Sequence, residues 1–223
     1  MRSRADAPLL GGAVLAGGWC LPALAPIVPP VADLLRVRRR LERITLTFDD
    51  GPHPEGTPAV LELLSAARVT ATFFMVGERI LAAPDVAAEV ARRGHTIGVH
   101  GHRHRNLLRL TPAAIGRDLD LAADVIATHT GVTPTWHRAP YGIYSWPALG
   151  LVRARGWSPL LWSRWGHDWR AGATAASIAA EATRDLATGD VILLHDGDDY
   201  SAPGSWRATV AALPRILDAV QGR

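Results

Sequence analysis

The sequence predicts an α/β fold built on a parallel sheet or barrel, and two observations carry this prediction. From residue 44 onward, six short apolar, β-branched or aromatic runs alternate with six alanine- and leucine-rich stretches. This repeat spans about 180 residues, which is short for a complete eightfold barrel of about 250. The predicted strands are Ile44–Phe48, Val69–Val76, Thr96–His100, Thr135–Arg138, Pro159–Ser163 and Val191–Leu194.

Helix boundary signals support the stretches between these strands. Threonine followed by proline, at Thr57 and at Thr111, is typical of an N-cap with proline at the first helical position. Helix stops are predicted at Gly94, Gly131, Gly156 and Gly189. The predicted helices are Thr57–Ala67, Glu78–Arg93, Thr111–Thr130, Tyr144–Arg155, Thr174–Ala187 and Ser205–Val220.

Composition excludes several classes of protein. Hydrophobic residues make up 48% of the chain and charged residues 20%, which excludes a disordered protein. The single cysteine, Cys20, excludes an intramolecular disulfide and a cysteine-rich zinc module.

The positive charge is confined to the N-terminus. The net charge is +3 and the pI is about 9.7, which in a single domain would suggest a polyanionic partner. Residues 1–43 carry +4, whereas residues 44–223 carry −1. We therefore expect no nucleic-acid partner for the main domain, and we place the basic character in a separate leader.

Residues 1–43 form an apolar segment flanked by arginines. The uncharged stretch Ala7–Ala32 contains a proline-free piece, Leu9–Leu21, of 13 residues, whereas a spanning helix needs about 20. A piece of this length fits a signal-peptide core, and Ala23-Leu24-Ala25 resembles a cleavage site. Three interpretations stay open, namely a membrane anchor, a cleaved export signal and an apolar hairpin packed on the domain. If the segment spans once, the following arginine run predicts a cytoplasmic orientation for the domain.

Residues with catalytic potential fall at the carboxyl ends of the predicted strands, where parallel α/β folds place their active sites. These residues are Asp49, Asp50, His100, His102, His104, Arg138, Asp168 and His195. Asp49 and Asp50 end the first strand, so their side chains face opposite ways and can take different roles. The alternative interpretation is a turn that is punctuated by Gly51 and Pro52.

The histidines after the third strand are candidate metal ligands. His100 and His104 have the i, i+4 spacing that one helical turn needs to hold zinc, and an aspartate would complete an open catalytic set. The alternative is an exposed basic loop, because Arg103 and Arg105 interleave with the histidines.

The remaining candidates suit acid–base chemistry and ligand binding. His195 ends a buried strand and is a candidate acid or base, with a satisfied core histidine as the alternative. Asp168 is predicted to fix its tautomer, and Arg138 to hold a carboxylate in a bidentate pair. Seven of the eight tryptophans lie between Trp136 and Trp206, where they form either core packing or a wall for sugar rings.

Taken together, these segments resemble the polysaccharide deacetylase family (NodB-homology domain, carbohydrate esterase family 4) over residues 44–220. The five segments that resemble its motifs are Thr47–His53, His100–His104 with Asn106-Leu107, Arg138–Gly142, Asp168-Trp169 and Leu193–Asp196. Their order and spacing make the resemblance far more specific than any one motif.

The resemblance implies a distorted, incomplete (β/α) barrel and a metal-dependent hydrolase of N-acetyl groups on amino-sugar glycans. It implies zinc, or another divalent metal such as cobalt, held by Asp50, His100 and His104. The roles it implies are Asp49 as base paired with Arg138, His195 as acid paired with Asp168, the Tyr141 N–H in the oxyanion hole and Leu193 in the acetyl pocket. We expect Trp165 and Trp169 to contact the substrate.

Two departures from the family pattern leave the substrate subclass open. Gly101 replaces the usual serine or threonine, and Trp165 stands where an acidic residue is common. The alternatives are a deacylase or deformylase of a lipid-linked sugar, a cyclic-amide hydrolase, and an inactive carbohydrate-binding module. We expect the protein at the cell envelope, membrane-associated through its N-terminus or exported, with a cytoplasmic-face orientation also open.

Overall fold

β1 (Thr45–Asp49) is an interior strand of a seven-stranded sheet in which every strand pair is parallel. The computed structural model describes residues 19–222. The other strands are β2 (Thr72–Met75), β3 (Thr96–Val99), β4 (Trp136–His137), β5 (Ser158–Pro159), β6 (Arg164–Trp165) and β7 (Val191–His195). They lie in the order β5-β4-β3-β2-β1-β7-β6.

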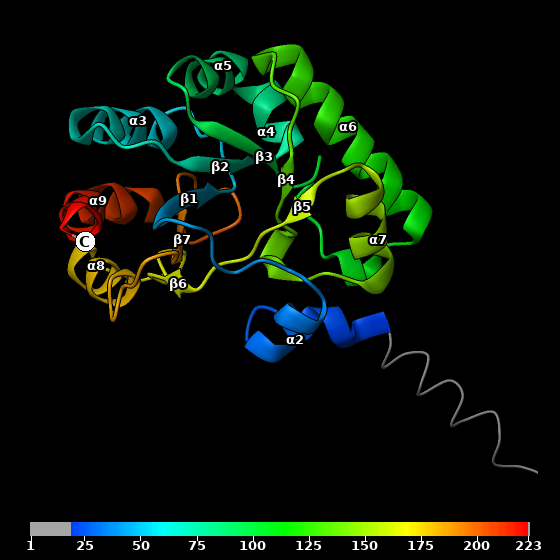
Figure 1. Cartoon of the computed structure of the whole chain (residues 1–223). Coiled ribbons are helices and arrows are strands. Elements are labelled where there is room, and N and C mark those ends of the chain that lie inside the picture. The colour runs from blue at the N-terminus through cyan, green and yellow to red at the C-terminus, as the bar shows by residue number, and fades with distance from the viewer. Residues whose placement is uncertain (1–18, 223) are drawn as a thin grey trace, which may run out of the picture.

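The sheet curves without closing, because β5 and β6 remain unpaired with each other at its two edges. Figure 1 shows the helices arranged around the outside of this curved sheet. They are α3 (Gly56–Ala67), α4 (Gly77–Ala82), α5 (Pro84–Arg92), α6 (Pro112–Thr130), α7 (Trp146–Ala154), α8 (Ala175–Ala182) and α9 (Ser205–Gln221). Short 3-10 turns form η2 (Leu107–Arg109) and η3 (Pro140–Gly142).

The strand register brings the carboxyl ends of β1 and β7 together. Asp49, the last residue of β1, lies opposite His195, the last residue of β7. On the other side, Val99 lies opposite His137, so His100 and Arg138 follow from adjacent strand ends. Sequence-distant polar residues therefore meet at one edge of the sheet.

Two helix boundaries follow the expected physical rules. The Thr111 hydroxyl accepts a hydrogen bond from the Ala114 N–H at 3.3 Å, which caps α6. Gly131 ends α6 with a φ of +70°, a backbone conformation that glycine adopts without steric cost.

Four local predictions are wrong. The helix predicted over Thr174–Ala187, with its stop at Gly189, already ends at Ala182. Thr57 is not an N-cap, since α3 begins at Gly56 and the Thr57 hydroxyl binds elsewhere. The helix predicted over Glu78–Arg93 breaks into α4 and α5, because Pro84 has no N–H to continue the hydrogen-bond ladder.

The strand predicted over Pro159–Ser163 is also wrong, because that run crosses between the two edges of the sheet. Leu160 donates to the His137 carbonyl at 2.9 Å, and Ser163 donates to the Val191 carbonyl at 3.0 Å. The side chains between them are buried, and a continuous apolar run does not distinguish a strand from such a crossing.

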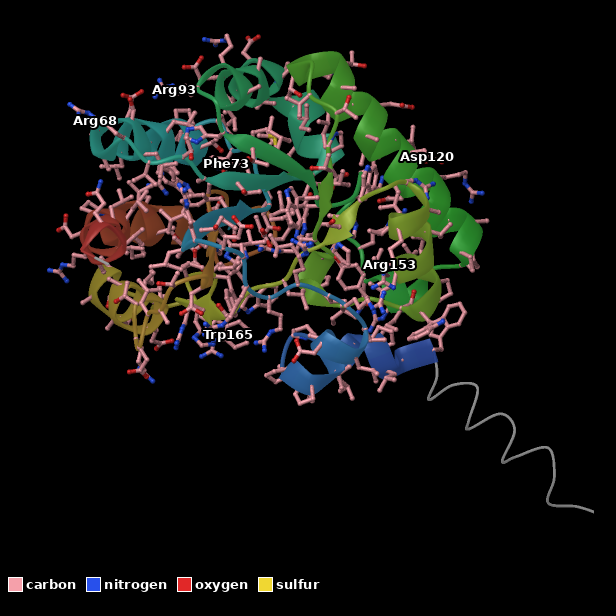
Figure 2. All side chains as sticks on the ribbon, in the orientation of Figure 1. Arg68, Phe73, Arg93, Asp120, Arg153 and Trp165 are labelled. Carbon is pink, nitrogen blue, oxygen red and sulfur yellow. The ribbon has the colours of Figure 1, made fainter. Side chains whose placement is uncertain are left out.

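The core lies between the sheet and the helices, and Figure 2 shows side chains filling this space. Phe48 and Phe73 stack on adjacent strands with ring centroids 5.1 Å apart. The labelled Phe73 lies on β2 within this layer (Figure 2).

The described part of the N-terminal segment packs on the domain through η1 (Leu21–Leu24) and α2 (Pro29–Leu34). The side chains of Ala25, Ala32, Leu35 and Val37 belong to the same buried core as the sheet. Arg153 on α7 donates to the Leu35 carbonyl and ties the segment down (Figure 2). Most of the proposed signal core, Leu9–Leu21, lies outside the described residues. Within residues 19–222, no helix combines the length and apolar character needed to cross a bilayer.

Candidate active site

A cavity of about 390 Å³ opens at the carboxyl ends of the strands. It collects most of the residues predicted to form a site, from five different strand ends. Its lining residues are Asp49, Asp50, His100, His104, Tyr141, Gly142, Trp162, Trp165, Trp169, Leu193, His195, Tyr200 and Ser201. Arg138 and Asp168 lie directly behind it and are fully buried.

Asp50, His100 and His104 converge on one point of this cavity. The Asp50 Oδ1 atom lies 3.4 Å from His100 Nε2 and 3.3 Å from His104 Nε2. All three ligand atoms lie within 4.8 Å of one another. Asp50 reaches this point because its φ is +78°, a left-handed conformation that aspartate tolerates better than most residues.

These donors suit a divalent metal ion. The Asp50 Oδ1 atom is buried and accepts no hydrogen bond within the described residues, so it has an unused lone pair. The His100 Nδ1–H donates to the Arg138 carbonyl at 2.8 Å, which leaves Nε2 free for ligation. Burial lowers the pKa of His104 to about 4, so this ring is neutral at pH 7.

The charge of Asp50 completes the set. Burial alone would raise the pKa of Asp50, but the adjacent His100 side chain and the charges of His195 and His104 lower it to about 2. One carboxylate and two imidazoles match an open catalytic metal set.

The two candidate histidine ligands lie in a loop, so the prediction that one helical turn presents them is wrong. Asp118 of α6 holds this loop through two hydrogen bonds. It accepts from the His102 N–H at 2.8 Å and from the Arg105 guanidinium at 2.6 Å. Gly101 turns the chain with a φ of +89°, and a Cβ there would lie 3.0 Å from the Asp118 carboxylate. Close approach of Asp118 therefore depends on glycine at position 101.

Asp49 is fixed by a buried arginine. The Arg138 Nη1 atom donates to Asp49 Oδ1 at 2.6 Å and to the Thr47 hydroxyl at 2.8 Å. The predicted bidentate pair is not formed, because the Nε and Nη2 atoms donate to the Leu160 and Leu161 carbonyls at 3.1 and 3.0 Å. The second oxygen of Asp49, Oδ2, lies 3.8 Å from His100 Nε2, facing the metal-ligand cluster.

His195 is fixed from the opposite side. Its Nδ1–H donates to Asp168 Oδ1 at 2.9 Å, so Nε2 faces the cavity 3.9 Å from Asp50 Oδ2. Asp168 Oδ2 accepts from the His195 N–H at 2.7 Å and from the Thr209 hydroxyl at 2.8 Å. Burial disfavours the imidazolium, but the Asp168 carboxylate outweighs burial and raises the pKa of His195 to about 10.

Tyr141 contributes its backbone to the cavity. Its φ is +60°, and its N–H donates to no other backbone group within the described residues. The Tyr141 ring lies edge-on to His104 with a centroid distance of 4.5 Å. Such a backbone N–H can donate to a developing oxyanion.

An aromatic wall, formed by Trp162, Trp165 and Trp169, lines the side of the cavity near His195. The Trp165 ring centroid lies 5.6 Å from that of Trp162 and 5.9 Å from that of Trp169. Trp169 in turn lies 5.5 Å from the His195 ring. Leu193 lines the same cavity, so its walls suit a small apolar group and the face of a sugar ring.

A second group of possible ligands, His53, Asp198 and Asp199, does not suit a metal. The His53 Nδ1 atom accepts from the N–H groups of Gly56 at 2.9 Å and of Glu55 at 3.2 Å. The proton of the neutral ring therefore sits on Nε2, which faces Asp198 and has no lone pair for a metal. Asp199 is already paired with Arg79 at 2.9 Å.

Residues 37–158 match the family model described as polysaccharide deacetylase. The chain belongs to this family.

The similarity to known relatives extends over most of the chain. A chitooligosaccharide deacetylase of Azorhizobium caulinodans is 34% identical over 195 residues, covering 84% of this chain and 92% of the relative. The crystal structure of the Bc1960 peptidoglycan N-acetylglucosamine deacetylase superposes with a TM-score of 0.77 at 28% identity, covering 83% of this chain and 86% of that one. An acetyl xylan esterase from Clostridium thermocellum, solved with a cobalt ion, superposes with a TM-score of 0.71 at 28% identity, covering 81% and 84%.

Membership confirms the incomplete barrel and the prediction of a hydrolase that acts on carbon–nitrogen bonds. The donor set and the cobalt-containing relative support a divalent metal as cofactor.

Sequence reasoning missed two supports of the enzyme's metal-ligand cluster. Tyr200 stacks on His104 at a centroid distance of 4.3 Å, and its hydroxyl donates to Glu78 at 2.6 Å. The sequence signal that could have found Tyr200 is its position in the loop that follows the strand ending at His195. Asp118 was missed as well, although an acid on the buried face of α6, beside Ile115 and Ala122, is itself a signal.

Proposed function

We propose that the enzyme removes N-acetyl groups from amino sugars of a glycan, with a divalent metal held by Asp50, His100 and His104. One observation carries the proposal. A carboxylate fixed by arginine and a histidine fixed by aspartate flank this cluster, with Asp49 Oδ2 3.8 Å from His100 Nε2 and His195 Nε2 3.9 Å from Asp50 Oδ2. When bound, the metal supplies Lewis acidity that polarises the carbonyl and lowers the pKa of water.

Asp49 acts as the general base in this proposal. The Arg138 hydrogen bond occupies Oδ1 and leaves Oδ2 directed at the cluster, where the attacking water must lie. A general base needs a carboxylate oxygen that is free to accept the proton of the water, and Oδ2 is that oxygen.

His195 acts as the general acid. Its raised pKa keeps the imidazolium populated at neutral pH, and Asp168 directs the Nε2 proton into the cavity. The departing amine of the sugar needs this proton, because an unprotonated amide anion is a poor leaving group. The Tyr141 N–H donates to the oxyanion that forms when water adds to the carbonyl.

The aromatic wall and Leu193 hold the substrate. The wall offers flat apolar faces to a sugar ring, and Leu193 limits the space beside the reacting carbonyl to a small acyl group. Trp165 adds apolar surface where related sequences commonly carry an acid, which favours a neutral acylated sugar over a cationic one.

We propose zinc as the resident metal, because two imidazoles and one carboxylate are typical of catalytic zinc. Cobalt accepts the same donors. The glycan is proposed to belong to the cell envelope, and we propose that the N-terminus associates with the membrane. A lipid-linked sugar is the second candidate substrate, because an apolar, arginine-rich segment borders the cavity.

The test is a screen for acetate release over chitooligosaccharides, peptidoglycan, acetyl-xylan and lipid-linked amino sugars. We expect release from an N-acetylated amino sugar, loss of it with chelator, and recovery with Zn²⁺ or Co²⁺. Full activity of the metal-free protein would overturn the proposal.

A variant separates catalysis from binding. His195→Ala is expected to retain the metal and lose turnover, because it removes the proton donor but none of the three ligands. Sugar binding by the wild type without any acetate release would instead identify an inactive binding module.

A further inference from the structure

Most of the exposed large apolar side chains belong to two segments of the chain. Within residues 19–222, seven large apolar side chains are exposed, and five of them belong to two segments. This apolar rim consists of Leu24, Ile27 and Leu34 in the N-terminal segment and Tyr141 and Trp146 around η3 and α7. Single exposed apolar residues are ordinary, but a concentration of this kind marks an interaction surface.

The two segments of the apolar rim meet beside the active site. A Cβ placed on Gly142 would lie 3.1 Å from the Cγ atom of Pro26, so the backbone of η3 touches the N-terminal segment. Arg39 fixes this contact by donating to the Pro26 carbonyl at 3.3 Å and to the Trp162 carbonyl at 3.1 Å. Gly142 and Trp162 both line the active-site cavity. The apolar rim therefore borders the mouth of that cavity.

An arginine cluster, Arg36, Arg38 and Arg40, follows α2 directly. All three side chains are exposed, and with Asp33 they line a shallow depression of about 500 Å³. Residues 19–43 carry a net charge of +3 even with Asp33 and Glu42 included. Figure 1 shows α2 below the body of the domain, on the side of α7.

We propose that the apolar rim and the arginine cluster seat the enzyme on an anionic lipid surface, with the mouth of the active site beside the bilayer. Apolar and aromatic side chains next to arginines match the interface of a bilayer, where tails, headgroups and anionic charge occur together. Arg40 is paired with Asp190 at 2.8 Å, whereas Arg36 and Arg38 form no ion pair within residues 19–222. A purely apolar protein partner would leave Arg36 and Arg38 without counter-charges. The consequence for the substrate, a glycan held at that surface, rests on the proposed function.

The experiment measures binding of the full chain to vesicles of phosphatidylcholine with and without phosphatidylserine. We expect binding that requires phosphatidylserine and weakens with salt. Leu34→Glu and Ile27→Glu are each expected to weaken binding about tenfold, because an apolar side chain is lost from the lipid contact. Arg36→Gln and Arg38→Gln are each expected to weaken it about fivefold.

Matched controls lie elsewhere on the surface. Leu81→Glu and Leu121→Glu replace exposed leucines of α4 and α6, and Arg92→Gln replaces an exposed arginine of α5. These variants are expected to bind vesicles like the wild type. Equal binding by the wild type and Leu34→Glu would overturn the proposal. So would a wild-type dimer in sedimentation that Leu34→Glu makes monomeric, since a second copy would then cover the surface.

Failure of the lipid proposal can be distinguished from failure of the proposed function by measuring acetate release from a soluble substrate. Acetate release from a soluble chitooligosaccharide is expected to be the same in the wild type and in Leu34→Glu, because Leu34 does not line the cavity. Absence of release in both proteins would count against the proposed function and leave the vesicle result to decide the lipid proposal by itself.

Discussion

The Asp118 carboxylate of α6 accepts a hydrogen bond from the backbone N–H of His102, midway between the histidines at positions 100 and 104. The same carboxylate is paired with Arg105, one residue beyond the second histidine. Asp118 touches neither ligand side chain in these contacts, and its influence on the cluster passes through the backbone of the loop.

Asp118→Ala is expected to lower the affinity of the protein for Zn²⁺ about tenfold or more, as is usual when a group supporting metal ligands is lost. The physical reason is that the His102 N–H and Arg105 lose their buried partner, so the loop no longer holds the two rings in place. Calorimetric titration of chelator-treated protein with Zn²⁺ measures this affinity. Asp120→Ala is the control, because Asp120 points outward from the same helix (Figure 2). Equal affinities in the two variants would contradict the role of Asp118.

Asp168→Asn is expected to lower the pKa of His195 from about 10 toward the ordinary histidine value of about 6.5. The neutral amide removes the carboxylate that outweighs burial. An NMR titration of the His195 ring in chelator-treated protein measures the shift directly. The alkaline limb of kcat/KM should move to lower pH in the variant, and an unchanged limb would argue that His195 is not the acid.

The ion pair between His195 and Asp168 is also expected to make the stability of the protein depend on pH. Because the folded-state pKa of His195 lies above its unfolded value, the stabilisation is complete below about pH 6.5 and is lost as pH rises through about 10. The free energy of unfolding of chelator-treated protein should therefore fall over this window. Urea unfolding at several pH values measures it, and Asp168→Asn should show a smaller fall.

Arg138→Lys is expected to reduce the stability of the enzyme by about 2–5 kcal/mol and turnover more than a hundredfold. A lysine cannot reach Asp49, Thr47 and the two leucine carbonyls at once, so buried acceptors lose their donor. Urea unfolding and acetate release measure the two effects. Wild-type stability in the variant would show that the four hydrogen bonds contribute little.

Adjacent leucines test whether the N-terminal segment is part of the folded domain. Leu35 is 4% exposed and Leu34 is 74% exposed. Leu35→Ala is expected to cost about 2–4 kcal/mol of the free energy of unfolding, as for other core leucines, and Leu34→Ala less than about 0.5 kcal/mol. Similar small effects in both variants would mean that the segment unfolds independently.

The sequence was sufficient for the parts of the fold that depend on local pattern. The apolar run ending at Val76 contains β2, and the runs ending at Phe48 and Leu194 stop one residue before the ends of β1 and β7. The helix predicted from Thr111 to Thr130 begins and ends within one residue of α6. The sequence was insufficient where tertiary packing decides the local structure. The run from Pro159 to Ser163 has the composition of a strand, but its carbonyls are used by Arg138 across the barrel.

The candidate site, like the fold, could be predicted from the sequence only in part. Strand-end position predicted that Asp49, Asp50 and His195 would meet, because parallel strands bring their carboxyl ends to one edge. Nothing in the local sequence predicted that the arginine would use one nitrogen for Asp49 and the others for backbone carbonyls. That choice depends on where the crossing run lies, which is set by the completed barrel.

The pairing of β1 with β7 has a consequence for synthesis of the chain. The two strands are neighbours in the sheet, yet Asp49 and His195 lie far apart in the sequence. At translation rates of about 5–20 residues per second, the ribosome needs roughly 7–30 s to make the chain between them. During that time one edge of β1 has no partner strand, and the proposed proton donor does not yet exist. A nascent chain is therefore inactive until His195 has been made, and until then the exposed edge of β1 is a site for aggregation.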